Sequence, residues 1–228
     1  MLISIEKRFM FLANTKTAST SIEDALLPYT DIYRGGTPAR KHISARDAYP
    51  AYPFLFKQPD FAPRTFFRFG VMREPMDWIG SWFRYRKGNQ VETPLPEEMD
   101  FAGFWEQNDW NIRRPNGNKR LQSDMFCHRD GQPIVDMVIP FHEVAKTFQE
   151  ICGALGIPAP LPHMNASHIQ MPSVIPERLL DEVREYYAVD YALWDQLDAL
   201  NANGRNKLMT RIGPAVRKKM ATAQAGKR

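Results

Sequence analysis

A short polar turn near the start of the chain combines one lysine with several hydroxyl side chains. This turn, residues 15–21, has the sequence Thr-Lys-Thr-Ala-Ser-Thr-Ser. The apolar run before it, residues 9–13, predicts a short buried strand, and the pattern after it predicts a helix that begins at Ser19 and ends before Pro28. Such a unit directs unpaired backbone N–H groups and the positive end of the helix dipole at one point. With the mobile charge of Lys16 added, the turn predicts a binding site for a phosphate or sulfate group.

The same turn also fits an ordinary helix cap that binds no ligand. Thr20 and Glu23 have the spacing of a capping box, in which each side chain bonds the backbone N–H group of the other residue. Both interpretations stay open for this segment considered alone, because short motifs also occur by chance.

A second candidate site pairs Arg73 with Ser81. The aromatic-rich residues 65–72 predict a second buried strand, and a helix follows it. Arg73 therefore ends a strand and Ser81 lies on the next helix, so both can face the carboxyl edge of the sheet, where open α/β folds bind ligands. A guanidinium and a hydroxyl together suit a phosphate monoester. A surface ion pair between Arg73 and Glu74 or Asp77 is the alternative.

The elements that must hold these two sites alternate between strand and helix patterns. A third strand is predicted over residues 134–139, followed by a helix over residues 144–155 that Gly156 closes. Two further helices are predicted over residues 176–187 and 190–200. The alternation predicts an α/β fold of the P-loop-like, three-layer kind, with a largely parallel central sheet flanked by helices.

Two stretches have no long hydrophobic period. Residues 29–64 predict irregular structure with short helical pieces, and this stretch contains His42. Residues 88–120 contain aromatic side chains at helical spacing between positions 101 and 110. We expect these aromatic residues to form part of the core, and the lining of an acceptor site is the alternative.

Length and composition predict one globular domain followed by a tail. Of the 228 residues, 43% are hydrophobic and 25% are charged, as in ordinary globular proteins, and no apolar run is long enough to span a bilayer. Residues 1–200 are expected to form the domain and residues 201–228 the tail. We expect a cytoplasmic location, because no signal peptide or membrane anchor is recognised and Cys127 and Cys152 offer no disulfide framework.

The positive charge of the chain is concentrated in the tail. The net charge is +4, yet residues 201–228 contain eight basic residues and no acidic ones, which leaves residues 1–200 with a charge of −4. Such a segment predicts a solvated and loosely ordered end, with contact to a polyanion as the alternative. The slightly acidic body makes nucleic acid an unexpected partner.

Together the two candidate sites resemble those of the sulfotransferases that use 3′-phosphoadenosine 5′-phosphosulfate (PAPS). Residues 15–21 are similar to the 5′-phosphosulfate loop of that family, and Arg73 with Ser81 is similar to its 3′-phosphate site. The closest resemblance is to the carbohydrate-type branch, which includes the heparan sulfate 2-O-sulfotransferases and small bacterial relatives. Thr15 departs from the family, which usually has proline there. The resemblance covers most of residues 9–195 and continues at Gln122 and at residues 130–131, 135–139, 155–158, 161–167 and 185–190.

The resemblance implies a site and a mechanism for in-line transfer of a sulfuryl group. The residues expected to bind PAPS are Lys16, Thr17, Ala18, Ser19, Thr20, Ser21, Arg73 and Ser81. Lys16 would stabilise the charge that grows on the leaving phosphate. His42 would accept the proton of the acceptor, because related enzymes carry a histidine base between their two phosphate motifs and a histidine pKa lies near neutrality. A structural role in a turn is the alternative for His42.

The expected acceptor is a carbohydrate or another small molecule with a hydroxyl or amine group, and the reaction implied by the resemblance requires no metal. Four other histidines have no recognised metal-binding spacing, and they are His128, His142, His163 and His168. His163 and Asn165 are minor candidates for contact with the nucleotide or the acceptor.

Two rival functions remain open. A P-loop kinase or nucleoside triphosphatase shares the strand, turn and helix, but its loop requires glycines and residues 9–28 contain none. Asp136 lies inside a predicted strand rather than at its end, where a magnesium ligand would be expected. The other rival is a non-catalytic module that binds adenosine phosphates, or one that binds anions through the tail.

Overall fold

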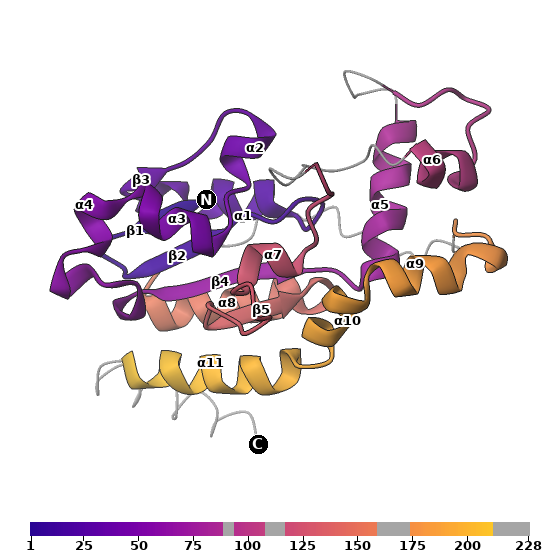
Figure 1. The fold of residues 1–228 in the computed structure, drawn as a ribbon. Helices are drawn as coiled ribbons and strands as arrows, with labels where there is room; N and C mark the ends of the chain where they lie inside the picture. Colours follow the sequence, from indigo (N-terminus) through magenta and orange to yellow (C-terminus); the bar gives the residue numbers. More distant parts are fainter. Residues whose placement is uncertain (89–93, 108–116, 159–173, 212–228) are drawn as a thin grey trace.

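Five strands form one sheet in the computed structural model, which describes residues 1–88, 94–107, 117–158 and 174–211 (Figure 1). The strands are β1 (Leu2–Ser4), β2 (Phe9–Leu12), β3 (Ile32–Tyr33), β4 (Phe67–Met72) and β5 (Met137–Pro140). Their order is β3-β1-β2-β4-β5. β4 pairs in parallel with β2 and β5, whereas β1 pairs antiparallel with β2 and β3. The α/β class is therefore confirmed, but the sheet is mixed, and its parallel part consists of β2, β4 and β5.

The antiparallel part of the sheet escapes the sequence-based prediction because its strands are very short. β1 contains three residues and β3 contains two, too few to display an alternating pattern. The three strands that the sequence predicts are present with shorter bounds. β5 begins at Met137 rather than Ile134, although Ile134 and Val135 are both buried.

The helices expected after the three parallel strands are present. α1 (Ser19–Leu26) follows β2, α5 (Pro75–Lys87) follows β4, and α8 (Val144–Leu155) follows β5. Gly156 closes α8 in the left-handed conformation, with φ of 66°. The other α-helices are α2 (Pro38–Lys41), α3 (Ala45–Ala51), α4 (Pro53–Phe56), α6 (Phe101–Gln107), α7 (Ser123–Phe126), α9 (Leu180–Tyr186), α10 (Ala188–Trp194) and α11 (Leu197–Arg211).

Helices cover both faces of the sheet, because successive side chains of a strand point to opposite sides. In β2, Phe9 and Phe11 pack together with apolar residues of α1 and α8. Met10 and Leu12 pack on the other face with apolar residues of α3, α4 and α7. The result is a helix, sheet and helix arrangement, and the N-terminal end of α1 lies at the carboxyl end of β2.

A third group of buried residues lies to one side of the sheet, where α5, α6 and α9 meet (Figure 1). Phe101, Phe104 and Trp105 of α6 are 2%, 1% and 7% exposed and pack in this group with Trp78 of α5. The core interpretation is confirmed for these three aromatic residues. Other residues named from the sequence lie outside the described part of the chain, and they are Trp110, His163, Asn165, His168 and residues 212–228.

The next two observations concern the cysteines and the apolar character of the helices. Cys127 and Cys152 are buried free thiols, as expected from the lack of a disulfide pattern. None of the helices in the described ranges combines the length and the apolar character that crossing a membrane requires.

The basic segment after residue 200 begins inside a packed helix. α11 runs along the edge strand β5 (Figure 1). The buried amide of Asn201 donates to the Val138 carbonyl at 2.8 Å and accepts from the Val138 N–H at 2.9 Å. Lys207 Nζ lies 2.7 Å from Asp136 Oδ1. The expected loosely ordered end is therefore wrong for residues 201–211, where basic side chains find acidic partners far away in the sequence.

Replacing Gly204 with alanine tests this packing. Alanine favours a helix over glycine by about 1 kcal/mol, but a Cβ at Gly204 would overlap the backbone oxygen of Asp136. We expect Gly204→Ala to lower the free energy of unfolding by about 1–3 kcal/mol in urea titrations.

The matched control is Gly153→Ala in α8, where the new Cβ would meet nothing within 4 Å apart from its chain neighbours and the backbone of its own helix. It should raise the free energy of unfolding by about 0.5–1 kcal/mol. Equal gains at both positions would contradict the packing of α11 on β5.

Candidate functional site

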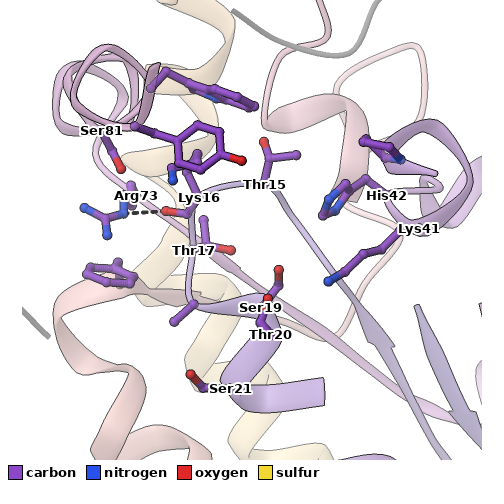
Figure 2. A pocket seen from close by; sticks show the side chains of 15 residues that line it. Thr15, Lys16, Thr17, Ser19, Thr20, Ser21, Lys41, His42, Arg73 and Ser81 are labelled. Atoms are coloured by element: carbon purple, nitrogen blue, oxygen red, sulfur yellow. Dashed lines mark hydrogen bonds between the residues drawn. The ribbon is translucent and has the colours of Figure 1, made fainter. Parts of the chain in front are cut away.

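A pocket of about 470 Å³ lies where the three parallel strands end. It is bounded by the turn after β2, by α5 after β4, and by Phe141 after β5. In Figure 2, Arg73 and Ser81 lie on one side of the turn, and Lys41 and His42 lie on the other. The lining includes every site residue expected from the sequence, namely Lys16, Thr17, Ala18, Ser19, Thr20, Ser21, His42, Arg73 and Ser81.

The turn after β2 presents the start of α1 to the pocket without a side-chain cap. Lys16 and Ala18 have left-handed backbone conformations, with φ of 59° and 56°. Ala18, rather than Thr20, is the N-cap residue of α1 and makes no side-chain cap bond. Glu23 instead accepts from Lys41 Nζ at 2.6 Å. The capping-box alternative is therefore wrong, and the first N–H groups of α1 can serve an anion.

Three hydrogen bonds hold the turn in this shape. Thr15 N donates to Asn14 Oδ1 at 2.8 Å, and Thr17 Oγ1 donates to the Asn14 carbonyl at 3.1 Å. Trp78 Nε1, from α5, donates to the Thr15 carbonyl at 2.8 Å. Proline at position 15 would lack the N–H group for the first bond. Thr15, where proline would lack this N–H group, thus adds a bond inside the turn.

Lys16 is a half-buried cation within the pocket. Its Nζ lies 3.7 Å from the centre of the Tyr85 ring, a cation–π contact. Among the described residues, no carboxylate lies within ion-pair distance of this ammonium. Burial, together with the charges of Arg73 and Arg84, lowers the pKa of Lys16 to about 8. An anion bound in the pocket would stabilise the charged form of Lys16.

Arg73 connects the two predicted sites. Its Nε donates to the Lys16 carbonyl at 2.6 Å, and its guanidinium carbon lies 3.6 Å from the centre of the Phe141 ring. Its Nη1 also pairs with Asp77 Oδ2 at 2.9 Å. The ion pair that the sequence offered as an alternative is thus present, but it coexists with contact to the turn. Burial lowers the pKa of Arg73 and the Asp77 carboxylate opposes this shift.

His42 is the C-cap residue of α2 and lies on the opposite wall of the pocket (Figure 2). Its Nδ1 lies 2.6 Å from the Ala13 carbonyl. A carbonyl oxygen can only accept, so we assign the proton to Nδ1, and Nε2 keeps its lone pair. Arg120 Nη1 donates to the His42 carbonyl and fixes this end of α2.

The environment of His42 favours the neutral imidazole. Burial, helped by the charges of Lys41, the N-terminus and Arg120, lowers the pKa of His42 to about 4. The hydrogen bond to Ala13 opposes this shift but is weaker than the effect of burial. His42 is therefore unprotonated at neutral pH, as a general base must be before it acts.

The pocket also contains residues that the sequence analysis did not assign to it. Lys41 precedes His42, and Tyr85 lies one helical turn after Ser81, so chain position relative to the predicted site residues could have identified both. Phe141 follows β5 at the carboxyl edge and could have been found in the same way. Pro38 and Trp82 complete the lining, and no sequence signal marks them.

Asp136, the residue considered for a magnesium site, does not line the pocket. It precedes β5 and therefore stands at the amino edge of the parallel strands, opposite the pocket. Arg68 donates to both of its carboxylate oxygens, at 2.8 and 3.0 Å, and Lys207 binds it as well. Within the described ranges, no group of three His, Cys, Asp or Glu side chains is placed to hold a metal ion.

Comparison of this chain with protein-family models, with curated proteins and with solved structures gives no match. The interpretation of the pocket therefore depends on its own residues and their geometry.

The left-handed conformation of Ala18 predicts a stabilising substitution. A non-glycine residue in this region costs about 1–2 kcal/mol, which glycine avoids. We expect Ala18→Gly to leave the unfolding free energy unchanged or raise it by up to about 1 kcal/mol, measured in urea.

The same change at Ala145, an exposed position within α8, serves as the control and should cost about 1 kcal/mol. A loss at position 18 as large as that at position 145 would contradict the left-handed turn.

Proposed function

We propose that this chain is a sulfotransferase that moves a sulfuryl group from PAPS to a hydroxyl or amine of a carbohydrate or small-molecule acceptor. One observation carries the proposal. Lys16 and Arg73, which are separated by 57 positions in the sequence, line one pocket and are joined by a hydrogen bond from Arg73 Nε to the Lys16 carbonyl. A nucleotide with an anionic group at each end of its ribose could contact both.

The residues of the pocket suit the two ends of such a donor. Lys16 and the open N–H groups of α1 form a cationic site for a phosphosulfate. Arg73 and Ser81 provide a guanidinium and a hydroxyl for the ribose 3′-phosphate. In the fold, the proposal corresponds to a P-loop-like arrangement in which the strand β2, the turn and α1 hold the donor.

His42 is proposed as the group that accepts the proton of the acceptor. PAPS would supply the sulfuryl group and leave as adenosine 3′,5′-bisphosphate. The bond from sulfur to the donor phosphate oxygen breaks while the bond from sulfur to the acceptor oxygen or nitrogen forms. The proton of the acceptor passes to Nε2 of His42, and Lys16 stabilises the charge on the leaving phosphate.

The kinase alternative has less support from the residues of the pocket. Its glycine-rich loop is absent from residues 9–28. Asp136 is bound by Arg68 and Lys207 at the amino edge of the strands, so it is not available beside the turn. The proposal retains the expectation of a cytoplasmic enzyme.

Calorimetry with adenosine 3′,5′-bisphosphate tests the two anion sites. We expect Lys16→Ala and Arg73→Ala each to weaken binding about tenfold or more, because a lost charged contact to a phosphate costs about 1.5–3 kcal/mol. Lys146→Ala removes an exposed charge from α8 and should leave the affinity unchanged. Unchanged binding in both pocket variants would defeat the assignment.

The pH dependence of the same binding tests the environment of Lys16. Because the pKa of Lys16 is about 8 in the empty pocket, the ammonium is present below pH 8 and is lost above it. Affinity for the bisphosphate should therefore fall as pH rises through 8 in the wild type. In Lys16→Ala this fall should be absent.

Transfer assays with radiolabelled PAPS and a panel of sugars and small alcohols test His42. We expect His42→Ala to lower the transfer rate by a factor of about 10²–10⁴ while bisphosphate affinity stays within about twofold. Because neutral His42 is the active form and its pKa is about 4, kcat/KM on the acid side should fall only as pH approaches 4. Binding without transfer to any acceptor would favour the non-catalytic alternative.

A further inference from the structure

Gln122 is a fully buried residue whose side chain bonds to both proposed anion-binding segments, the turn with Lys16 and the segment with Arg73. Its Oε1 accepts from Asn14 Nδ2 and from the backbone N–H of Arg73, both at 3.1 Å. Its Nε2 donates to the Arg73 carbonyl at 2.9 Å. Gln122 does not line the pocket, so it would act on a ligand only through these two neighbours.

Each bonding partner of Gln122 belongs to one of the two proposed anion-binding segments. Asn14 accepts from Thr15 N and Thr17 Oγ1 and so shapes the turn that carries Lys16. Arg73 supplies the guanidinium of the second segment, and Gln122 holds its backbone on both the N–H and the carbonyl side. The Gln122 amide therefore bonds to one residue of each segment, and Asn14 Nδ2 also donates to the Val71 carbonyl at 3.2 Å.

The position of Gln122 is itself fixed by a buried carboxylate on α10. Asp190, which is 0% exposed, accepts from Gln122 N at 3.0 Å and from Ser123 N at 2.8 Å. These contacts prevent the segment that carries Gln122 from moving away from the strand ends. The path from α10 to the pocket thus consists of hydrogen bonds between buried groups.

We propose that Gln122 is a positioning residue that sets the distance between the Lys16 turn and Arg73, so that both act on the two anionic groups of one ligand. This inference rests on the proposed function. It predicts that, without the amide, a ligand with two phosphates should bind with less of its extra affinity over a ligand with one phosphate.

The chemistry requires an amide of this length. Methionine has nearly the same shape but can neither donate to the Arg73 carbonyl nor accept from its N–H. Asparagine retains the amide but withdraws it by one methylene group. Both Gln122→Met and Gln122→Asn should therefore disturb the spacing, and the second variant leaves fewer buried polar groups without a partner.

The chain offers a matched control in Asn201. Its buried amide holds the backbone of Val138 on both sides, as Gln122 holds Arg73, and it does not line the pocket. Asn201→Leu thus removes the same kind of interaction at a comparable cost in stability.

The experiment compares the affinities of adenosine 3′,5′-bisphosphate and adenosine 5′-monophosphate by calorimetry, with thermal midpoints measured in parallel. In the wild type the bisphosphate should bind more tightly. In Gln122→Met and Gln122→Asn the ratio of the two affinities should fall by about three- to tenfold. In Asn201→Leu the thermal midpoint should fall but the ratio should stay at the wild-type value. An unchanged ratio in both Gln122 variants would overturn the proposal, because it would make Gln122 a purely structural residue.

Hydrogen exchange without ligand separates this inference from the proposed function. If wild-type protein binds neither nucleotide, the proposed function fails, but the amides of Thr15 and Arg73 still report on the spacing. We expect both amides to exchange faster in the Gln122 variants and at the wild-type rate in Asn201→Leu. Wild-type exchange at both amides in Gln122→Met would overturn the positioning role.

Discussion

The parallel pairing of β2 with β4 is the constraint on which the candidate site depends. In this pairing Leu12 lies opposite Gly70, so the chain leaves both strands at the same edge of the sheet. The close approach requires glycine at position 70, since a Cβ there would meet the Phe126 ring and the Leu12 carbonyl. The turn that contains Lys16 and the residue Arg73 consequently emerge side by side, and the bond between them closes the arrangement.

Much of the fold can be predicted from the sequence because the parallel strands and their helices carry clear local signals. Residues 9–13 and 65–72 are apolar runs that end in polar turns, and Gly156 marks the end of α8. Once the fold class is assigned, the carboxyl ends of these strands must share an edge. This shared edge, together with the resemblance of the two segments to sulfotransferase phosphate sites, explains why Lys16 and Arg73 could be assigned to one site from sequence, although neither segment alone excludes a structural role.

The remaining features depend on contacts between residues that are distant in the sequence. The buried face of α11 contains Leu197, Asn201, Gly204 and Leu208, which follow a helical period, but only the two leucines have large apolar side chains. A hydrophobic pattern therefore does not reveal it, and the basic side chains between them suggest a solvated segment. The role of Gln122 is equally hidden, because a glutamine in a sequence gives no sign of the backbone groups that it will meet.

The contact between Lys16 and Tyr85 has a consequence for competition among anions in the cell. The ammonium gains about 0.5–2 kcal/mol from the aromatic face, depending on its desolvation. An incoming ion that draws the ammonium away must supply more than this amount. Small, well-hydrated ions such as chloride bring a single charge and give up their own hydration, whereas the multivalent nucleotide proposed as donor would also contact Arg73 and the start of α1. For the proposed donor, the Tyr85 ring would therefore lower the occupancy of the pocket by abundant singly charged anions.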